Sequence, residues 1–197
     1  MAVVILLGLI ATIVTPVVRT MLKDSKQKLY EEQIVLIEEG LKSWASSNIF
    51  LLPEENDTIK LSLGQLKQAG FLEIKIKNPT NSKCFSNEIN LKIVSYNNSY
   101  IYEVEDINSI DCDLIEDAPI IKLNGSVVEY LNIGEEYVDA GVIAQNSEGE
   151  DITNSVTTTI SGSGTIIDTT KEGSYTITYR VEENDKVMTA IRNVIIK

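Results

Sequence analysis

The segment AVVILLGLIATIVTPVV, residues 2–18, carries no charge and differs from everything that follows it. As an α-helix it would span about 25 Å, slightly less than the roughly 30 Å hydrocarbon core of a membrane. A cleaved secretory signal would begin with basic residues, and Met1 supplies none. A buried core helix normally keeps a polar face, which this run lacks. The segment therefore predicts a membrane-inserted helix.

An amphipathic helix is predicted to continue directly from the apolar run. Its apolar residues recur mostly at steps of three, four or seven, and its other face is charged. No proline interrupts the chain between residues 17 and 52. Residues 2–47 would then form one helix of roughly 70 Å, kinked at Pro16, where proline removes a backbone hydrogen bond. The apolar stripe consists of Val17, Val18, Met21, Leu22, Leu29, Ile34, Ile37, Leu41 and Trp44.

This helical region resembles the N-terminal helix of type IV pilins and pseudopilins, particularly those of Gram-positive bacteria. The resemblance is carried by AVVILLGLIATIVTP, by YEEQIVLIEEGLKSWA and by Pro16, which matches the kink proline of the family helix. The stretch LSLGQLKQAGFLEIKIKNPTNSKCFSNEINLKI resembles the head domain of such pilins, so that the likeness covers about residues 2–104. It implies a helix that starts in the membrane and later packs into the centre of a filament.

The start of the sequence departs from the prepilin pattern. Prepilins carry a basic leader, a glycine cleavage site, and then an aromatic residue and a glutamate, whereas this sequence begins at Met1 inside the apolar run. We expect a mis-assigned start or a truncation. The basic residues nearest the run lie after it, which by the positive-inside rule would put the following chain inside the cell. The missing leader would reverse that assignment, so the topology stays open.

The middle segment, residues 49–117, reads as a small α/β head. Ser62–Ala69 followed by Gly70 predicts a short helix with a glycine cap. Two alternating runs, around Ile89–Ile93 and Tyr100–Val104, are separated by turn residues and predict a β-hairpin. The acidic stretch Glu103–Asp117 lacks the register of an EF-hand calcium loop and is interpreted as a solvated linker.

From Pro119 onward the chain consists of β-branched runs separated by glycine and asparagine. This pattern predicts an all-β sandwich of short strands. The alternation of residues 175–181 predicts one buried and one wet face. The candidate strands are Ile120–Leu123, Val127–Leu131, Val142–Ala144, Val156–Ile160, Gly164–Ile167, Ser174–Val181 and Val187–Ile196.

This region resembles the bacterial Ig-like modules found on surface proteins and beside the pesticidal crystal proteins. The likeness covers residues 119–197 and is carried by PIIKLNG (119–125), YVDAG (137–141), EDIT (150–153) and GSYTITY (173–179). It implies a spacer, stalk, or adhesive or carbohydrate-contacting unit. Asp139 and Asp151 are weighed as calcium ligands, but turn capping by aspartate is the simpler explanation.

Composition excludes several functions. The chain has 197 residues, no histidine and a net charge of −12, so histidine-based catalysis and zinc sites are excluded and no nucleic acid is expected. The two cysteines, Cys84 and Cys112, do not form a CxxC motif. They are either unpaired thiols or one disulfide, which an exported domain would favour. No catalytic, cofactor or metal site is predicted, and the chain is not expected to be an enzyme.

The sequence therefore predicts an α+β architecture in three parts. Residues 1–48 form a long transmembrane helix with its membrane segment at 2–18, residues 49–117 form a pilin-like α/β head with an acidic linker, and residues 118–197 form an Ig-like β-sandwich. The expected function is a structural subunit of a type IV pilus-like or type II secretion-like filament that displays the Ig-like domain at the cell surface. The alternative is a non-polymerising membrane-anchored adhesin. Membrane lipid, like subunits and a surface ligand or carbohydrate are the expected partners of this single-pass protein.

Overall fold

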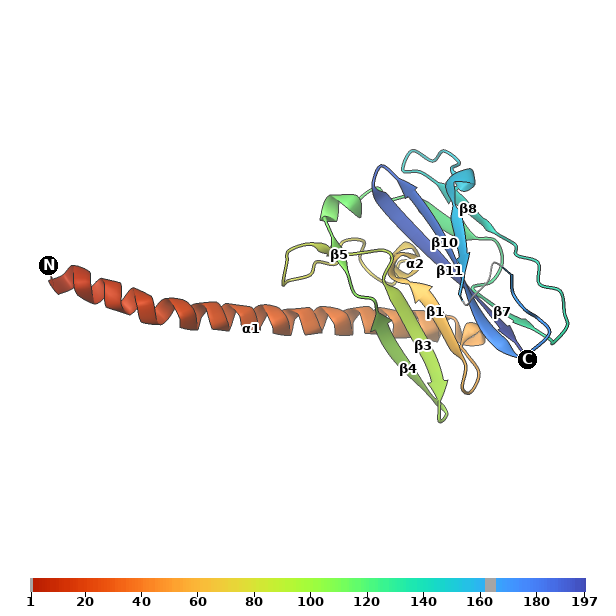
Figure 1. Ribbon diagram of the computed structural model, residues 1–197, viewed down its shortest axis with the longest axis horizontal. Coiled ribbons are helices and arrows are strands. Elements are labelled where there is room, and N and C mark those ends of the chain that lie inside the picture. The colour runs from red at the N-terminus through yellow and green to blue at the C-terminus, as the bar shows by residue number, and fades with distance from the viewer. Residues whose placement is uncertain (1, 162–165) are drawn as a thin grey trace.

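The computed structural model describes residues 2–161 and 166–197, with side chains described from residue 17 onward. One long helix, α1 (Ala2–Ser47), packs its C-terminal half on a β-rich body and extends away from it toward the N-terminus (Figure 1). The C-terminus lies at the opposite end of the molecule (Figure 1). The shape is therefore a rod with a globular body at one end.

Helix α1 is held on the body by apolar residues spaced three and four apart. Ile37, Leu41, Trp44 and Ala45 are each at most 5% exposed, because this spacing places them on one face of an α-helix. Gly40 allows a close approach on the same face, since a Cβ atom there would lie 2.6 Å from the Leu72 side chain. The predicted helical rod is thus confirmed for residues 2–47.

The kink predicted at Pro16 stays a prediction. The backbone of α1 is helical through this position, but the side chains of residues 1–16 lie outside the described part of the structure. The predicted membrane segment, residues 2–18, falls largely on the same residues. Among the described residues, no helix combines the length and apolarity that crossing a membrane requires.

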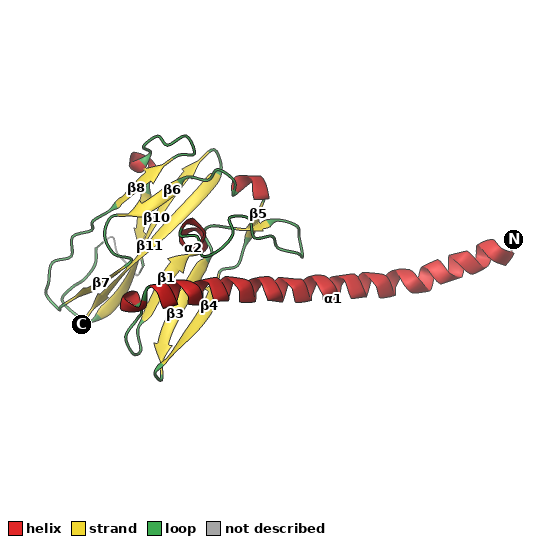
Figure 2. Cartoon of the chain, turned by 180° about the vertical axis from the view of Figure 1, so that it is seen from behind, coloured by secondary structure: helices red, strands yellow, loops and turns green. Residues whose placement is uncertain are grey.

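The middle segment forms a three-stranded antiparallel sheet against α1 (Figure 2). Its order is β1 (Thr58–Ser62), β3 (Asn90–Tyr96) and β4 (Ser99–Glu105). Asn97 and Asn98 connect β3 to β4 with φ angles of 52° and 56°, the left-handed conformation that a tight two-residue hairpin needs. The predicted hairpin is therefore confirmed.

A short helix, α2 (Leu63–Gln68), follows β1 directly. Ser62 caps its first turn through a capping box with Gln65, and Gly70 ends the region with φ +80°. A short two-stranded sheet pairs β2 (Cys84–Phe85) with β5 (Ser109–Ile110). Two 3₁₀ turns complete the segment, η1 (Ile49–Leu51) and η2 (Cys112–Leu114). The predicted helix at this position is confirmed, although it is shorter than Ser62–Ala69.

The C-terminal part consists of two packed sheets. Strands β10 (Gly173–Glu183) and β11 (Lys186–Ile196) pair along their whole length, with β9 (Thr157–Ile160) beside β10 and β7 (Val128–Leu131) parallel to β11. The second sheet pairs β6 (Ile120–Leu123) with β8 (Val142–Gln145), and a 3₁₀ turn, η3 (Thr153–Ser155), follows β8. A core that includes Ile121, Ala144, Tyr179 and Val194 fills the space between the sheets. Of the predicted strands, Gly164–Ile167 lies partly outside the described residues, and its described members are not in a strand.

The predicted fold class is wrong in two respects. The body is mostly of β-sandwich type, and the segment between α1 and the Ig-like strands does not form a separate pilin-like α/β head. Its only α-helix among the described residues has six residues, and its core is continuous with β7 and β11 through Val128 and Ile195. The other error concerns the transmembrane helix, for which the described residues contain no sufficient apolar span.

The predicted acidic linker is also part of this body. Glu103 and Glu105 belong to β4 and pair with Lys92 and Lys60 at 2.8 Å, and Ile115 is 2% exposed. Lysines of β1, of β3 and of two loops pair with several of its carboxylates. These contacts are not visible in its composition.

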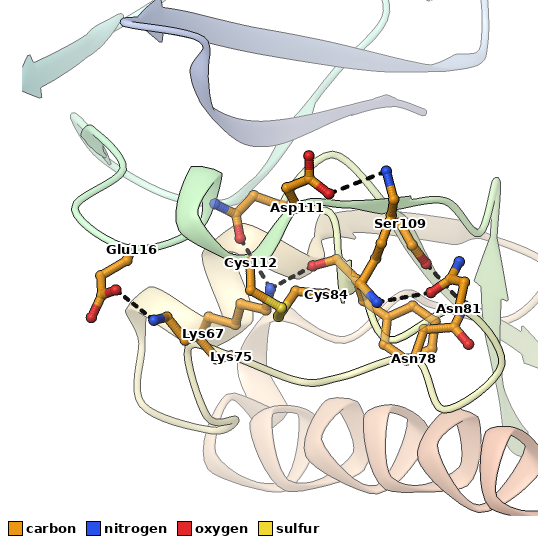
Figure 3. Close-up of a disulfide and its surroundings, with 12 residues drawn as sticks. Lys67, Lys75, Asn78, Asn81, Cys84, Ser109, Asp111, Cys112 and Glu116 are labelled. Carbon is orange, nitrogen blue, oxygen red and sulfur yellow. Dashed lines mark hydrogen bonds and ion pairs between the residues drawn. A yellow bond between two sulfur atoms is a disulfide. The ribbon is translucent and has the colours of Figure 1, made fainter. Parts of the chain in front are cut away.

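A disulfide joins Cys84 of β2 to Cys112 of η2, with their Cα atoms 4.9 Å apart (Figure 3). We expect the double variant Cys84→Ser/Cys112→Ser to lose about 3–4 kcal/mol of stability, because the bond shortens the unfolded chain by a loop of 28 residues. In a chain of this size, the loss corresponds to a fall in Tm on the order of 10 °C. Calorimetry with and without reductant measures it, and the double variant serves as the reductant control. An unchanged midpoint would show that the bridge does not contribute to stability.

Candidate functional site

Helix α1 presents a second apolar surface that the body leaves uncovered. Met21 and Leu22 are 65% and 58% exposed, and Val35 remains 50% exposed although the helix packs on the body at this level. The helix therefore has apolar side chains on two faces, of which the chain buries one. Contiguous exposed apolar surface of this kind marks an interaction site. The exposed apolar residues of the described part of α1 are Val17, Val18, Met21, Leu22, Leu29, Val35 and Leu36.

Charges on the same helix are segregated into two bands. The basic band is Arg19, Lys23, Lys26 and Lys28, with Asp24 as an acidic exception between them, and the acidic band is Glu31, Glu32, Glu38 and Glu39. Within the described part of the chain, none of these eight side chains forms an ion pair. The helix therefore carries mainly positive charge between residues 19 and 28 and negative charge between residues 31 and 39.

The seam between the middle segment and the Ig-like strands fixes the direction of this helix. The side chain of Asn193, on β11, accepts a hydrogen bond from the Lys60 backbone nitrogen and donates one to the Lys60 carbonyl, both at 2.8 Å. The side chain of Gln65, on α2, accepts a hydrogen bond from the Ile191 nitrogen of β11 at 2.9 Å. It donates another to the Ile191 carbonyl at 3.0 Å. Two amide side chains thus replace the backbone pairing of adjacent strands.

Further polar contacts extend the seam along β11. Ser62 Oγ donates to the Thr189 carbonyl, Thr189 Oγ1 donates to the Asn87 carbonyl, and Asn87 Nδ2 donates to the Val187 carbonyl. Arg180 of β10 adds an ion pair to Glu88 at 2.8 Å. Because alternate residues of β11 face the middle segment and the others face the Ig-like core, the strand is buried on both sides.

A cavity of about 700 Å³ opens beside this seam, and a buried lysine lines it. Lys67 is 3% exposed and donates to the Phe85 carbonyl and to Asn87 Oδ1, at 2.9 and 3.1 Å. Its partner Phe85 directly follows Cys84 of the disulfide, and Figure 3 shows Lys67 together with Cys84 and Cys112. Its hydrogen-bond partners are neutral, and burial lowers the pKa of Lys67 to about 8. Lys75 and Glu116 pair at 2.5 Å on the cavity wall.

The two aspartates weighed as calcium ligands have protein partners instead. Asp139 Oδ1 accepts hydrogen bonds from Tyr179 and Arg192, both at 2.6 Å, and also caps its own turn through the Gly141 nitrogen at 3.0 Å. Asp151 accepts a hydrogen bond from the Thr153 nitrogen at 2.9 Å in the turn that leads into η3. Both side chains therefore bond to turn backbone, as the turn explanation predicted. In the described ranges, no three acidic or thiol side chains gather as a metal site.

Asp139 has a structural role, because it pairs with the buried guanidinium of Arg192. This guanidinium is fully buried and also donates to the carbonyls of Asn124 and Gly141. A buried cation requires a compensating anion, and Asp139 supplies it. Burial raises the pKa of the neighbouring Tyr137 to about 12, which keeps this phenol neutral. The cluster ties the loop after β7 to β11.

Residues 121–196 match the family described as bacterial surface protein, Ig-like domain. The C-terminal part of the chain is therefore an Ig-like domain of the bacterial surface type, as its sequence predicted, and the match supports a location at the cell surface. A crystal structure of the lipoprotein BT2262 from Bacteroides thetaiotaomicron shares 28% identity over 40% of this chain and 37% of that chain, with a TM-score of 0.35. No curated protein matches the chain. None of these comparisons supports the pilin resemblance of residues 2–104.

We expect Asn193→Ala to lower the free energy of unfolding by roughly 1–3 kcal/mol, because it removes a buried amide that pairs with both the nitrogen and the carbonyl of Lys60. Asn81→Ala, in an exposed loop, is the matched control and should change stability by less than about 0.5 kcal/mol. Urea unfolding followed by tryptophan fluorescence reports on Trp44, which lies in the core that the seam adjoins. Equal effects of the two substitutions would contradict the role of Asn193.

Burial of the charged Lys67 amine lowers the free energy of unfolding. We expect this loss to disappear as the pH rises from 8 to about 10.4. The unfolded chain keeps the ordinary amine pKa of about 10.4, so that between these values it binds more protons than the folded chain and stability increases with pH. The difference in unfolding free energy between the native chain and Lys67→Met should therefore shift by roughly 2–3 kcal/mol in favour of the native chain between pH 7 and pH 10.

Lys23→Met, which removes an amine from the exposed part of α1, is the control for the substitution itself. A ¹³C NMR titration of the Lys67 side chain provides a second measurement that does not depend on the variant. A titration midpoint near 10.4 would show that the amine is not destabilised by burial.

Proposed function

We propose that this chain is a structural subunit that displays an Ig-like domain at the bacterial cell surface and assembles with like subunits through α1. The assembly would be a filament of the type IV pilus or type II secretion kind. The observation that carries the proposal is the exposed apolar surface of α1, which begins at Val17 and continues to Leu36 alongside the body. Lipid contact by the apolar residues 2–18 belongs to the same proposal.

The free energy available from burying this apolar surface is comparable to the cost of association. Complete burial of a large apolar side chain is worth about 1.5–3 kcal/mol, so that covering the seven half-exposed side chains of α1 would contribute roughly 5–10 kcal/mol. Association costs about 4–15 kcal/mol in lost translational and rotational freedom. A single helix pair is then marginal, and a subunit contacted by several neighbours is stable. This arithmetic favours a multi-subunit assembly over a simple dimer.

The direction of display follows from the rigid body. Helix α1 points its N-terminus away from the Ig-like strands (Figure 1). If the N-terminal half of the helix lies inside an assembly, the Ig-like domain lies at the outside. The seam on β11 keeps it in that position, since rotation would break the paired amide contacts of Asn193 and Gln65.

A second candidate is a surface-anchored binding module that does not polymerise. The cavity beside Lys67 favours it, because a concave site of about 700 Å³ with a buried amine has the size and composition of a small-ligand pocket. The ligand would be a surface or carbohydrate partner, as the resemblance to Ig-like modules suggests.

Deletion of residues 1–28 tests the proposed assembly. Every residue of α1 in the body core lies at or after Tyr30, so the remaining chain should fold and behave as a soluble monomer. The full chain should form larger species at micromolar concentration in mild detergent. Light scattering coupled to size exclusion measures both, and circular dichroism checks folding. A monomeric full chain would favour the binding module, and an assembling truncated chain would place the contact elsewhere.

A further inference from the structure

The amine of Lys67 is a buried cation in the lining of the cavity of about 700 Å³. An ammonium group has three N–H donors. Within the described residues, the acceptors of this one are the Phe85 carbonyl and Asn87 Oδ1, and both are neutral. None of the ion pairs formed by the described residues includes Lys67. A buried charge is unfavourable unless an opposite charge lies beside it, so this position favours a ligand that brings an anion.

The second buried cation of the body shows the contrast. Lys67 and Arg192 are the two cations among the described residues that are buried. Arg192 has carboxylate partners within the chain, Asp139 at 2.6 Å and Glu129 at 3.5 Å. Arg192 is thus compensated by the fold itself, and it lies away from the cavity lining. Lys67 combines the opposite properties, a place in the cavity lining and neutral partners.

The walls of the cavity are mainly apolar. Ile74 and Ile120 are about half exposed, whereas Ile115 and Met188 are buried. The apolar lining therefore extends from the protein surface into the interior, where Lys67 lies. Such a cavity accepts a molecule whose body is apolar and whose polar group is at one end.

The charged residues at the rim restrict the charge of the ligand. The other charged residues of the lining are Glu73, Lys75, Glu116 and Asp117, and its three acids are exposed. Lys75 pairs with Glu116 at 2.5 Å, and this hydrogen bond lowers the pKa of Glu116 (Figure 3). Lys186 lies 3.9 Å from Asp117, and Glu73 has no ion-pair partner among the described residues. The rim thus keeps an excess of negative charge, which disfavours a ligand with a second anionic group.

We infer that the cavity binds a small monocarboxylate with an apolar body, whose carboxylate pairs with the Lys67 amine and whose body lies against Ile115 and Met188. A hydrogen bond between two charged groups is stronger than one between neutral groups, and burial strengthens it further. A neutral carbohydrate would leave the charge of Lys67 uncompensated and would place hydroxyl groups against apolar walls. The inference rests on the second candidate function, a binding module, and names its ligand class. It is independent of assembly through α1.

Calorimetric titration of the full chain at pH 7 tests the selection of a carboxylate. The probe is octanoate, and octanol and octyl glucoside carry the same alkyl chain on a neutral group. All are used below their critical micelle concentrations. We expect octanoate to bind on the order of tenfold more tightly than either neutral compound, and than octanedioate, whose second carboxylate meets the acidic rim.

Two substitutions locate the binding. Lys67→Met should remove the advantage of octanoate over octanol, whereas binding to the exposed apolar surface of α1 would not depend on Lys67. Lys77→Met is the matched control, because Lys77 is exposed and lies outside the cavity lining, and it should leave the affinity unchanged. Circular dichroism verifies that both variants are folded.

A ¹³C NMR titration of Lys67 in the native chain gives a measurement that needs no variant. A bound carboxylate favours the charged amine, so saturating octanoate should raise the pKa of Lys67 from about 8 to above about 9. Equal affinities for octanoate and octanol with an unchanged pKa would overturn the carboxylate preference and leave the binding module intact. Tighter binding of octyl glucoside would overturn it in favour of a carbohydrate. Absence of binding by all four compounds would contradict the cavity as a ligand site, and with it the second candidate function.

Discussion

The polar contacts along β11 are the constraint on which the rest of the structure depends. This strand is covered on both faces, so every polar group on it must find a partner inside the protein. Asn193 and Gln65 satisfy that requirement by pairing their amide side chains with the backbones of Lys60 and Ile191. An unpaired buried amide or carbonyl costs about 1–3 kcal/mol, so that separation of the two halves would be penalised at several points at once. The middle segment and the Ig-like strands therefore behave as one body.

The same seam fixes the orientation of α1 relative to the Ig-like strands. The core that holds Ile37, Leu41 and Trp44 continues into Val128 and Ile195, which belong to β7 and β11. At the end of the chain, Lys197 pairs with Glu54 and Asp57, so the last strand is also fastened to the segment that follows α1. Movement of the rod is thus transmitted to the Ig-like domain through buried contacts and not through a flexible linker.

Elements with a local signal could be predicted from the sequence, and contacts between distant segments could not. The hairpin at Asn97 and Asn98, the capped helix after Ser62 and most strands of the Ig-like domain follow from turn chemistry and alternation. Asn193 and Gln65 look like ordinary surface amides, because their partners lie 133 and 126 residues away. Lys67 and Arg192 were missed for the same reason. The change of composition at Pro119 gives no sign that the segments on its two sides share a core through Val128 and Ile195.

A rigid body changes what the exposed helix can do. With a flexible connection, the Ig-like domain could fold back and cover the apolar residues of α1 itself. The seam prevents this, because it holds the domain at the end opposite the N-terminus of the helix (Figure 1). Leu22 and Leu29 are 58% and 46% exposed, and burying them further requires another molecule. Basic side chains lie beside them between Arg19 and Lys28, with Asp24 among them, and α1 carries an acidic band about three turns further along. The unsatisfied surface of the rod and the rigidity of the body are therefore two consequences of the same packing on β11.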